Sequence, residues 1–178
     1  MKLLNIKDLK INPIDLIGNK WMLVSAGKKN KFNTMTASWG QIGALWGHRL
    51  NGKGTVTIFI RPSRYTDRFI NTNKCFSLSF FDNKYKKDLS YLGSHSGRDE
   101  DKISKTNLHV KFIDQVPAFK EASLVLICRK IYKGKINQKG FIDKSIITSF
   151  YKNATKNIYN NSSYHNVYIG EILKIYTK

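Results

Sequence analysis

Short runs of apolar residues recur along the chain, and their spacing predicts β-strands. Residues 76–81 alternate Phe and Leu with Ser, which is the period of two expected of a strand. Residues 55–60 are a continuous run of Thr, Val, Ile and Phe, which favour β-structure. The predicted strands cover residues 21–26, 32–39, 55–60, 76–81, 109–113, 122–132 and 164–176.

Turn and helix signals lie between these runs. Residues 27–31 have the composition of a turn, so the first two strands are predicted to form a hairpin. Residues 40–54 are rich in glycine and are predicted to be a loop. Short helices are predicted at residues 66–71 with Thr66 as N-cap, at 82–92 with Asp82 as cap, at 99–105, and at 143–151.

These elements predict a mainly β fold, an antiparallel barrel with a few short helices. The chain has 178 residues, of which 41% are hydrophobic, and both values suit one domain with one substantial core. No internal repeat, low-complexity tail or linker divides the sequence. We therefore expect a single domain over residues 1–178.

The formal net charge of +19 is the most unusual feature of the composition. Lysines are spread along the whole chain among many Asn and Ile residues, so much of this charge is expected on a solvated surface. Such a surface attracts phosphates and dinucleotides at low salt. Nucleic-acid binding is disfavoured, because there is no zinc finger, no RNA-recognition aromatic motif and no clustered basic stripe.

The cysteines and the first residues indicate the compartment. Cys75 and Cys128 lie inside apolar runs and are expected to be small buried residues, and no Cys/His cluster suggests a metal site. Residues 1–10 alternate Leu and Ile with Lys and Asp, unlike a signal peptide or a membrane span. We expect a cytoplasmic protein with no membrane partner and no metal.

The run RPSRYT at residues 61–66 is a candidate phosphate site. It follows a predicted strand and precedes a predicted helix, so guanidinium groups, hydroxyls and backbone N–H groups are expected close together. In the alternative interpretation, Arg61 and Arg64 face solvent and Thr66 only caps the helix.

The run NTMTASW at residues 33–39 places small and hydroxylated residues in a strand. A flat ligand can lie against such a strand, whose backbone N–H and C=O groups bind the polar edge of a heterocycle. The alternative is an edge strand of ordinary composition. A phosphate site and a flat platform together describe a nucleotide-like cofactor such as FMN.

Five blocks occur in an order and at a spacing that resemble one family. They are NxMTASW at 33–39, RPxRYT at 61–66, FSLS at 76–79, SGRDxDK at 96–102 and YIGEI at 168–172. The chain resembles the FMN-binding flavin reductase-like family over residues 13–172. This resemblance implies an antiparallel split β-barrel, assembled as a homodimer with FMN near the subunit interface.

The resemblance also implies the site residues, in three groups. The first block runs past the flavin ring and ribityl chain, which gives Thr34, Met35, Thr36, Ala37, Ser38 and Trp39. The second block holds the phosphate, which gives Arg61, Ser63, Arg64 and Thr66. Ser96, Gly97 and Lys102 would border the flavin or the nicotinamide, or their loop lies on the surface.

The histidines and glycines add two expectations. His48, His95, His109 and His165 show no metal-ligand spacing, although His165 is a candidate to face the flavin of a partner subunit. No Rossmann G-x-G-x-x-G motif is present, so NADH or NADPH must dock on the flavin pocket itself.

The implied activity is NAD(P)H-dependent transfer of hydride and electrons through FMN, with the flavin carrying the chemistry and no catalytic side chain needed. One alternative is an electron carrier of the flavoredoxin type with a protein partner. Another is a basic polyanion-binding module without redox activity.

Overall fold

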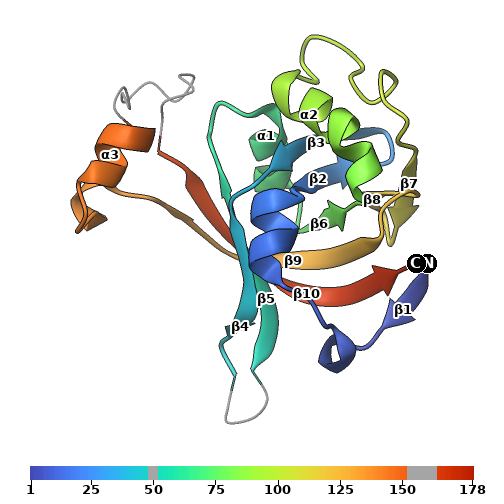
Figure 1. The fold of residues 1–178 in the computed structure, drawn as a ribbon, viewed down its shortest axis with the longest axis horizontal. Coiled ribbons are helices and arrows are strands. Elements are labelled where there is room, and N and C mark those ends of the chain that lie inside the picture. Colours follow the sequence, from blue (N-terminus) through green and yellow to red (C-terminus); the bar gives the residue numbers. More distant parts are fainter. Residues whose placement is uncertain (48–51, 152–163) are drawn as a thin grey trace.

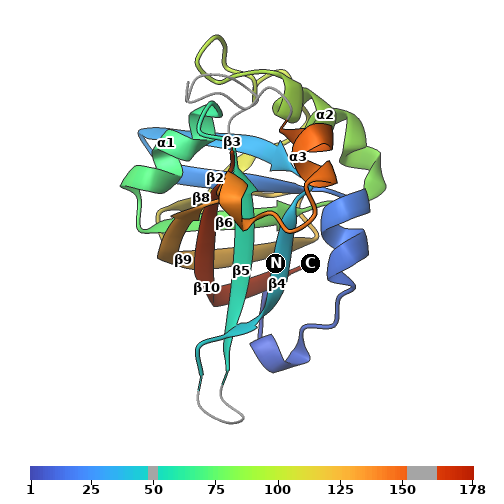
Figure 2. The same cartoon turned by 90° about the vertical axis from the view of Figure 1, so that its left-hand side faces the viewer.

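A computed structural model describes residues 1–47, 52–151 and 164–178. Its main sheet curls around an apolar interior, with the helices α1 (Tyr65–Thr72) and α2 (Lys86–Ser94) at the top of Figures 1 and 2. The strands of this sheet are β1 (Lys2–Leu4), β2 (Met22–Lys28), β3 (Lys31–Ala37), β4 (Gly40–Leu45), β5 (Lys53–Ile60), β6 (Cys75–Phe80), β9 (Leu124–Lys135) and β10 (Asn166–Thr177). A separate pair consists of β7 (Val110–Ile113) and β8 (Val116–Phe119).

The main sheet is antiparallel throughout and open. Its strands follow the order β3-β2-β6-β9-β10-β5-β4, and β1 pairs with β10. Among the described residues, the outer edges of β3 and β4 have no strand partner. The sheet is therefore curled without being closed, which agrees with the predicted mainly β, antiparallel split barrel.

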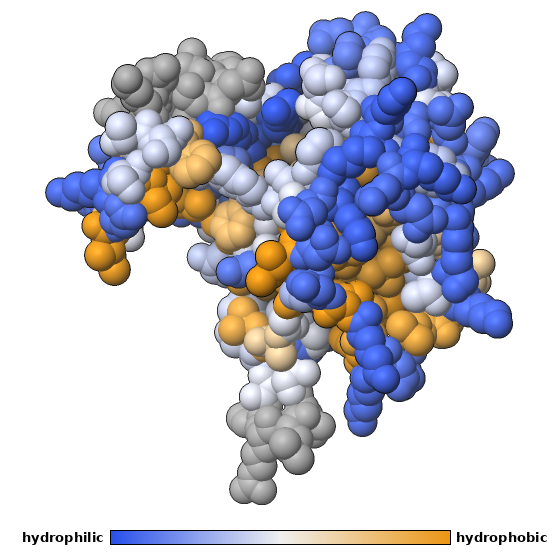
Figure 3. Space-filling view, in the orientation of Figure 1, coloured by the Kyte–Doolittle hydropathy of each residue, from blue (hydrophilic) through white to orange (hydrophobic). Residues whose placement is uncertain are grey.

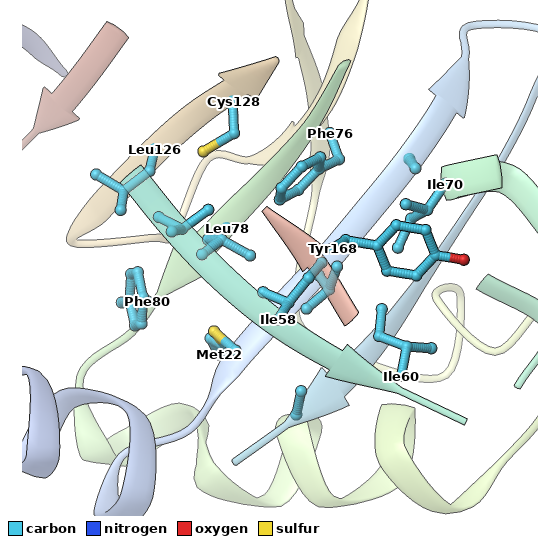
Figure 4. Packing of buried hydrophobic residues seen from close by; sticks show 14 of the residues in the cluster. Met22, Ile58, Ile60, Ile70, Phe76, Leu78, Phe80, Leu126, Cys128 and Tyr168 are labelled. Carbon is cyan, nitrogen blue, oxygen red and sulfur yellow. The ribbon is translucent and has the colours of Figure 1, made fainter. Parts of the chain in front are cut away.

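Successive residues of a strand point to opposite faces, and this alternation produces two apolar cores. Met22 and Val24 of β2 face the interior, whereas Leu23 faces the other side of the sheet. The interior cluster is drawn in Figure 4. The outer cluster lies between the sheet, α2 and the β7–β8 pair, and it includes Leu89 and Phe119.

The predicted hairpin of the first two strands is confirmed. β2 and β3 pair from Met22 and Ala37 to Lys28 and Lys31, which leaves a two-residue turn. Gly27 has a φ of +123°, and a Cβ at this position would lie 2.4 Å from the Cα of Phe32. The glycine is therefore required where the strands enter their turn.

The prediction of a loop over residues 40–54 is wrong where the structure describes it. Residues 40–45 form β4 and pair with residues 53–58 of β5. Two of the glycines that suggested a loop lie instead in crowded strand positions, since a Cβ would lie 2.9 Å from Cε of Met22 at Gly40 and 2.0 Å from Cδ1 of Ile6 at Gly54. The tip of this hairpin, with His48 and the neighbouring Arg49, lies outside the described residues.

The predicted helices are confirmed in part. α1 begins at Tyr65 with Arg64 as its N-cap, so Thr66 lies in the first turn and is not the cap. α2 begins at Lys86 after a 3₁₀ turn, four residues beyond the predicted cap at Asp82. Residues 99–105 form turns without a helix. The last predicted helix is present as α3 (Ser145–Phe150).

Buried polar contacts fasten α1 to the sheet. Asp67 is buried, and its Oδ1 accepts hydrogen bonds from the Tyr168 hydroxyl at 2.7 Å and from Asn166 Nδ2 at 3.0 Å. At the other end of α1, Lys130 Nζ donates to the carbonyl of Asn71 at 2.8 Å, where the helix dipole favours a cation. Figure 4 shows the Tyr168 ring within the interior cluster near Ile70 of α1.

Residues 136–151, which follow β9, form an arm that carries α3, at the left of Figure 1. Figure 3 shows the surface hollowed between this arm and the body that bears α1 and α2. The two termini lie side by side, because β1 pairs with the end of β10. Within the described ranges, no helix has the length and apolar character needed to cross a bilayer.

Candidate functional site

Two adjoining pockets lie beside β3. The basic pocket, of about 320 Å³, is lined by Asn33, Met35, Ser63, Arg64, Tyr65, Thr66, Leu92, Gly93, Ser94, His95, Ser96, Gly97, Arg98 and Lys102. The strand pocket, of about 190 Å³, is lined by Met35, Thr36, Ala37, Ser38, Trp39, Phe59, Arg61, Arg64 and His165. Met35 and Arg64 line both pockets, so the two spaces meet at these side chains.

The structure brings together all the predicted site residues except Thr34. The basic pocket holds Ser63, Thr66, Ser96, Gly97 and Lys102, the strand pocket holds Thr36, Ala37, Ser38, Trp39 and Arg61, and Met35 and Arg64 line both. Thr34 lines neither pocket. Its buried hydroxyl lies 2.8 Å from the hydroxyl of Ser25 on β2, so this side chain joins two strands.

Positive charge is concentrated in the basic pocket, where no acidic side chain appears among the described lining residues. Arg64 is exposed and its Nη1 donates to the carbonyl of Gly93 at 3.2 Å. Arg98 Nη1 donates to the carbonyl of Ser63 at 3.1 Å, and its guanidinium lies 5.1 Å from the ring centre of Tyr65. These contacts hold both guanidinium groups at the pocket.

The N-terminus of α1 adds to this charge. Ser63, Arg64, Tyr65 and Thr66 line the basic pocket, and no side chain caps the helix at Arg64. The first N–H groups of a helix and its dipole favour an anion. The basic pocket is therefore suited to a phosphate group.

Lys102 is 4% exposed and closes the pocket from the side of α2. Its Nζ donates to the carbonyls of Leu92 and His95, at 2.6 and 2.9 Å, at the C-terminal end of that helix. The pKa of Lys102 is lowered to about 8, first by burial and then by the nearby charge of Arg64. The side chain thus remains cationic at neutral pH and fastens the loop that lines the pocket.

Asn33 joins β3 to α1, and Gly97 of the loop after α2 lies close to the Asn33 side chain. Asn33 Nδ2 donates to the hydroxyl of Thr66 at 2.8 Å. A Cβ at Gly97 would lie 2.2 Å from Oδ1 of Asn33, so a larger residue there would displace the Asn33 side chain. Asn33 belongs to the first sequence block, but sequence reasoning assigned it no role, because its partner lies 33 residues away.

The strand pocket follows the end of β3, an edge strand. Alternate backbone N–H and C=O groups of an edge strand are not used by the sheet and are available to a ligand. Thr36 turns its hydroxyl away from this edge, because Oγ1 donates to the carbonyl of Leu89 in α2. The backbone beside Met35, Ala37 and Ser38 can therefore bind the polar edge of a flat ring.

Aromatic side chains form one wall of the strand pocket. The rings of Trp39 and His165 are 5.0 Å apart, and Trp39 also meets Phe150 of the α3 arm edge-on at 5.4 Å. The pKa of His165 is lowered to about 4, first by burial and then by the charges of Arg61 and Arg64. His165 is therefore neutral at physiological pH, and it faces a pocket of its own subunit.

The arm also holds Arg61, a contact that sequence reasoning missed. Arg61 Nη2 donates to the carbonyl of Phe150 at 3.1 Å, and its guanidinium lies 5.4 Å from the ring centre of Tyr151. Burial lowers the pKa of Arg61 from its usual range. No local signal in the sequence connects residue 61 with residues 150 and 151.

The comparisons with known proteins agree with this geometry. The flavin reductase like domain family matches residues 15–178. Among curated proteins, none matches the sequence significantly.

Several solved structures share the fold. A flavoredoxin from Methanosarcina acetivorans is 21% identical with a TM-score of 0.61, covering 96% of this chain and 75% of that one. A putative flavin reductase with a split barrel domain from Shewanella frigidimarina is 14% identical with a TM-score of 0.63, covering 97% and 77%. An NADH:FAD oxidoreductase from Streptomyces globisporus is 13% identical with a TM-score of 0.62, covering 89% and 75%.

The structural similarity supports the split-barrel fold. The family match supports a flavin as the cofactor and an oxidoreductase as the broad class of protein. The match covers every strand except β1, both helices beside the pockets and every described residue that lines the pockets. This chain belongs to the flavin reductase-like family.

Proposed function

We propose that this protein binds FMN across the two pockets and acts as an NAD(P)H-dependent flavin reductase. The observation that carries this proposal is the meeting of the basic pocket and the strand pocket at Met35 and Arg64. A cofactor with one phosphate at one end and a flat ring at the other fits this arrangement.

The residues present fit FMN in three respects. Arg64, Arg98 and the N-terminus of α1 supply donors for one phosphate group. The edge of β3 beside Ala37 supplies backbone groups for the polar edge of the ring. Trp39 and Phe59 supply apolar surface in the strand pocket.

Bound FMN would supply the hydride and electron chemistry, and the side chains would position it. Arg64 would hold the phosphate and orient the cofactor along the groove. Backbone N–H groups on β3 would stabilise negative charge on the reduced ring. His165 would contribute a neutral polar contact, since its pKa of about 4 excludes the imidazolium at pH 7.

The visible spectrum tests this proposal directly. We expect purified protein supplied with FMN to retain flavin bands through gel filtration and to lose them on anaerobic addition of NADH or NADPH. Bleaching would support the reductase, since the flavin must accept the hydride. A protein that retains no flavin would contradict the proposal and favour the polyanion-binding alternative.

A second candidate function is electron transfer to a protein partner. The net charge of +19 favours an acidic partner, and a flavoredoxin is among the similar structures. Flavin bands that persist after anaerobic NADH, but bleach with dithionite, would favour this electron carrier. Rapid NADH oxidation with added free FMN would favour the reductase.

We also propose that the protein is a homodimer. Large apolar side chains are exposed on its two projections, with Leu45 and Trp46 on the β4–β5 hairpin and Ile142 and Ile146 on the α3 arm. We take these exposed apolar side chains as candidate interface surface, to be buried by the second subunit. Light scattering is expected to give twice the mass of one chain, and a monomer that still binds FMN would contradict the dimer.

A further inference from the structure

Tyr151 makes a buried hydrogen bond to a residue that lines the strand pocket. It follows α3 at the end of the arm and is 4% exposed. Its hydroxyl lies 2.7 Å from Nδ1 of His165, which precedes β10. Tyr151 does not line either pocket, so any effect on a ligand there must act through another residue.

The arm holds the Tyr151 ring in place from several sides. The ring stacks on Tyr164 with centres 4.8 Å apart and lies under the guanidinium of Arg61. Arg61 is itself bonded to the carbonyl of Phe150, the preceding residue. Packing therefore restricts the Tyr151 side chain to a rotamer that directs its hydroxyl at His165.

Both partners of this hydrogen bond are neutral at physiological pH. Burial raises the pKa of Tyr151, although the charge of Arg61 opposes this shift, so the phenol keeps its proton. The pKa of His165 is about 4, so at neutral pH the imidazole is uncharged and carries one N–H and one acceptor nitrogen.

Burial decides which group donates. Within the described parts of the chain, the Tyr151 hydroxyl has no hydrogen-bond partner other than His165. If Nδ1 of His165 carried the proton, the buried phenolic hydrogen would have no acceptor, which is unfavourable. The phenol therefore donates to Nδ1, and the imidazole proton resides on Nε2.

We propose that Tyr151 is a positioning residue whose hydroxyl holds His165 as the Nε2–H tautomer, so that the imidazole offers a donor to a carbonyl oxygen bound in the strand pocket. Its consequence for catalysis rests on the proposed function. That carbonyl belongs either to the flavin ring or to the amide of the nicotinamide, and the two sources are separable by experiment.

The tautomer is tested without any cofactor. Long-range ¹H–¹⁵N spectra of the full chain distinguish a protonated Nδ1 from a protonated Nε2, and a His165→Gln variant assigns the signal. We expect Nε2–H in the wild type and a mixture in Tyr151→Phe, which removes only the hydroxyl. A wild-type Nδ1–H signal would overturn the proposal, and this reading of the wild type does not depend on whether Tyr151→Phe folds.

Tyr164→Phe is the matched control, because Tyr164 stacks on Tyr151 without a hydrogen bond to His165. It is expected to leave the tautomer of His165 unchanged. If Tyr164→Phe shifts the tautomer as far as Tyr151→Phe does, general loosening of the aromatic cluster explains the result and the hydroxyl has no specific role.

Kinetics identify the carbonyl. In Tyr151→Phe, binding is expected to weaken in proportion to the lost Nε2–H population, by about 2-fold for an even mixture of tautomers. A raised KM for NADH with an unchanged Kd for FMN identifies the nicotinamide, and a raised Kd for FMN identifies the flavin. If neither constant changes while the tautomer shifts, the role of His165 as a donor to a ligand is refuted.

The failure of this inference and that of the proposed function are distinguishable. A wild-type protein that shows the Nε2–H tautomer but retains no FMN contradicts the proposed function. The donation from His165 to a bound carbonyl is then refuted, whereas the control of the tautomer by Tyr151 stands. A wild-type protein that binds FMN and oxidises NADH, together with an unaltered Tyr151→Phe variant, contradicts the inference alone.

Discussion

Arg64→Ala is expected to weaken FMN binding by about 10- to 100-fold. Among the arginines that the structure describes, Arg64 alone lines both pockets, and its exposed guanidinium lies beside the N-terminus of α1. A charge-assisted hydrogen bond to a phosphate contributes about 1.5–3 kcal/mol, which corresponds to this factor. Fluorescence titration with FMN measures the change in Kd.

Two controls make this result specific to the phosphate. Riboflavin, which lacks the phosphate, is expected to bind wild type and Arg64→Ala with similar Kd values. Arg68→Ala removes the same charge from the same helix at a residue outside both pockets, and it should change the Kd for FMN by less than about 2-fold.

Arg98→Ala should have a smaller effect than Arg64→Ala, since Arg98 lines only the basic pocket and also packs on the Tyr65 ring, whereas Arg64 lies where the two pockets meet. Equal Kd values for FMN in Arg64→Ala and Arg98→Ala would refute the phosphate assignment.

Asp67→Ala is expected to lower the free energy of unfolding by about 3 kcal/mol. The buried carboxylate accepts from the Tyr168 hydroxyl and from Asn166 and Asn71, so its loss leaves three donors without this acceptor. Each buried unsatisfied polar group typically destabilises a protein by about 1–3 kcal/mol. Urea unfolding followed by circular dichroism measures the difference.

Tyr168→Phe and a double variant test the mechanism of that loss. Removing the hydroxyl alone should destabilise the protein by about 1 kcal/mol, and the double variant should be less destabilised than the sum of the two single variants. Asp8→Ala, at an exposed carboxylate, is the control and should change stability by less than about 0.5 kcal/mol. Additive effects of Asp67→Ala and Tyr168→Phe would show that their contact does not stabilise the fold.

The strands that carry the pocket could be predicted from the sequence, because their signals are local. Alternation of Phe and Ser over residues 76–80 places Phe76 and Leu78 in the interior, and the turn at Gly27 sets the register of β2 and β3. The five sequence blocks also predicted the family, which the match over residues 15–178 confirms.

Pairing between strands overrode local composition elsewhere. The glycine-rich residues 40–45 became β4, because the β-branched strand β5 offered a free edge along its whole length. Thr66 is a residue type that favours the N-cap position, but it is the second residue of α1. Its hydroxyl accepts a hydrogen bond from Asn33 of β3. In both cases the deciding partner is distant in sequence, so a local pattern could not reveal it.

The sequence by itself predicted which residues form the candidate site, since arginines and a strand rich in hydroxyl side chains are visible as residue types at short spacing. Only the tertiary structure decided how they meet: Gly97 against Asn33, Arg61 on the carbonyl of Phe150, and Tyr151 on His165. Each of these contacts joins segments between 14 and 89 residues apart. Such contacts depend on the path of the whole chain, because backbone pairing and burial, and not residue type, bring the partners within hydrogen-bond distance.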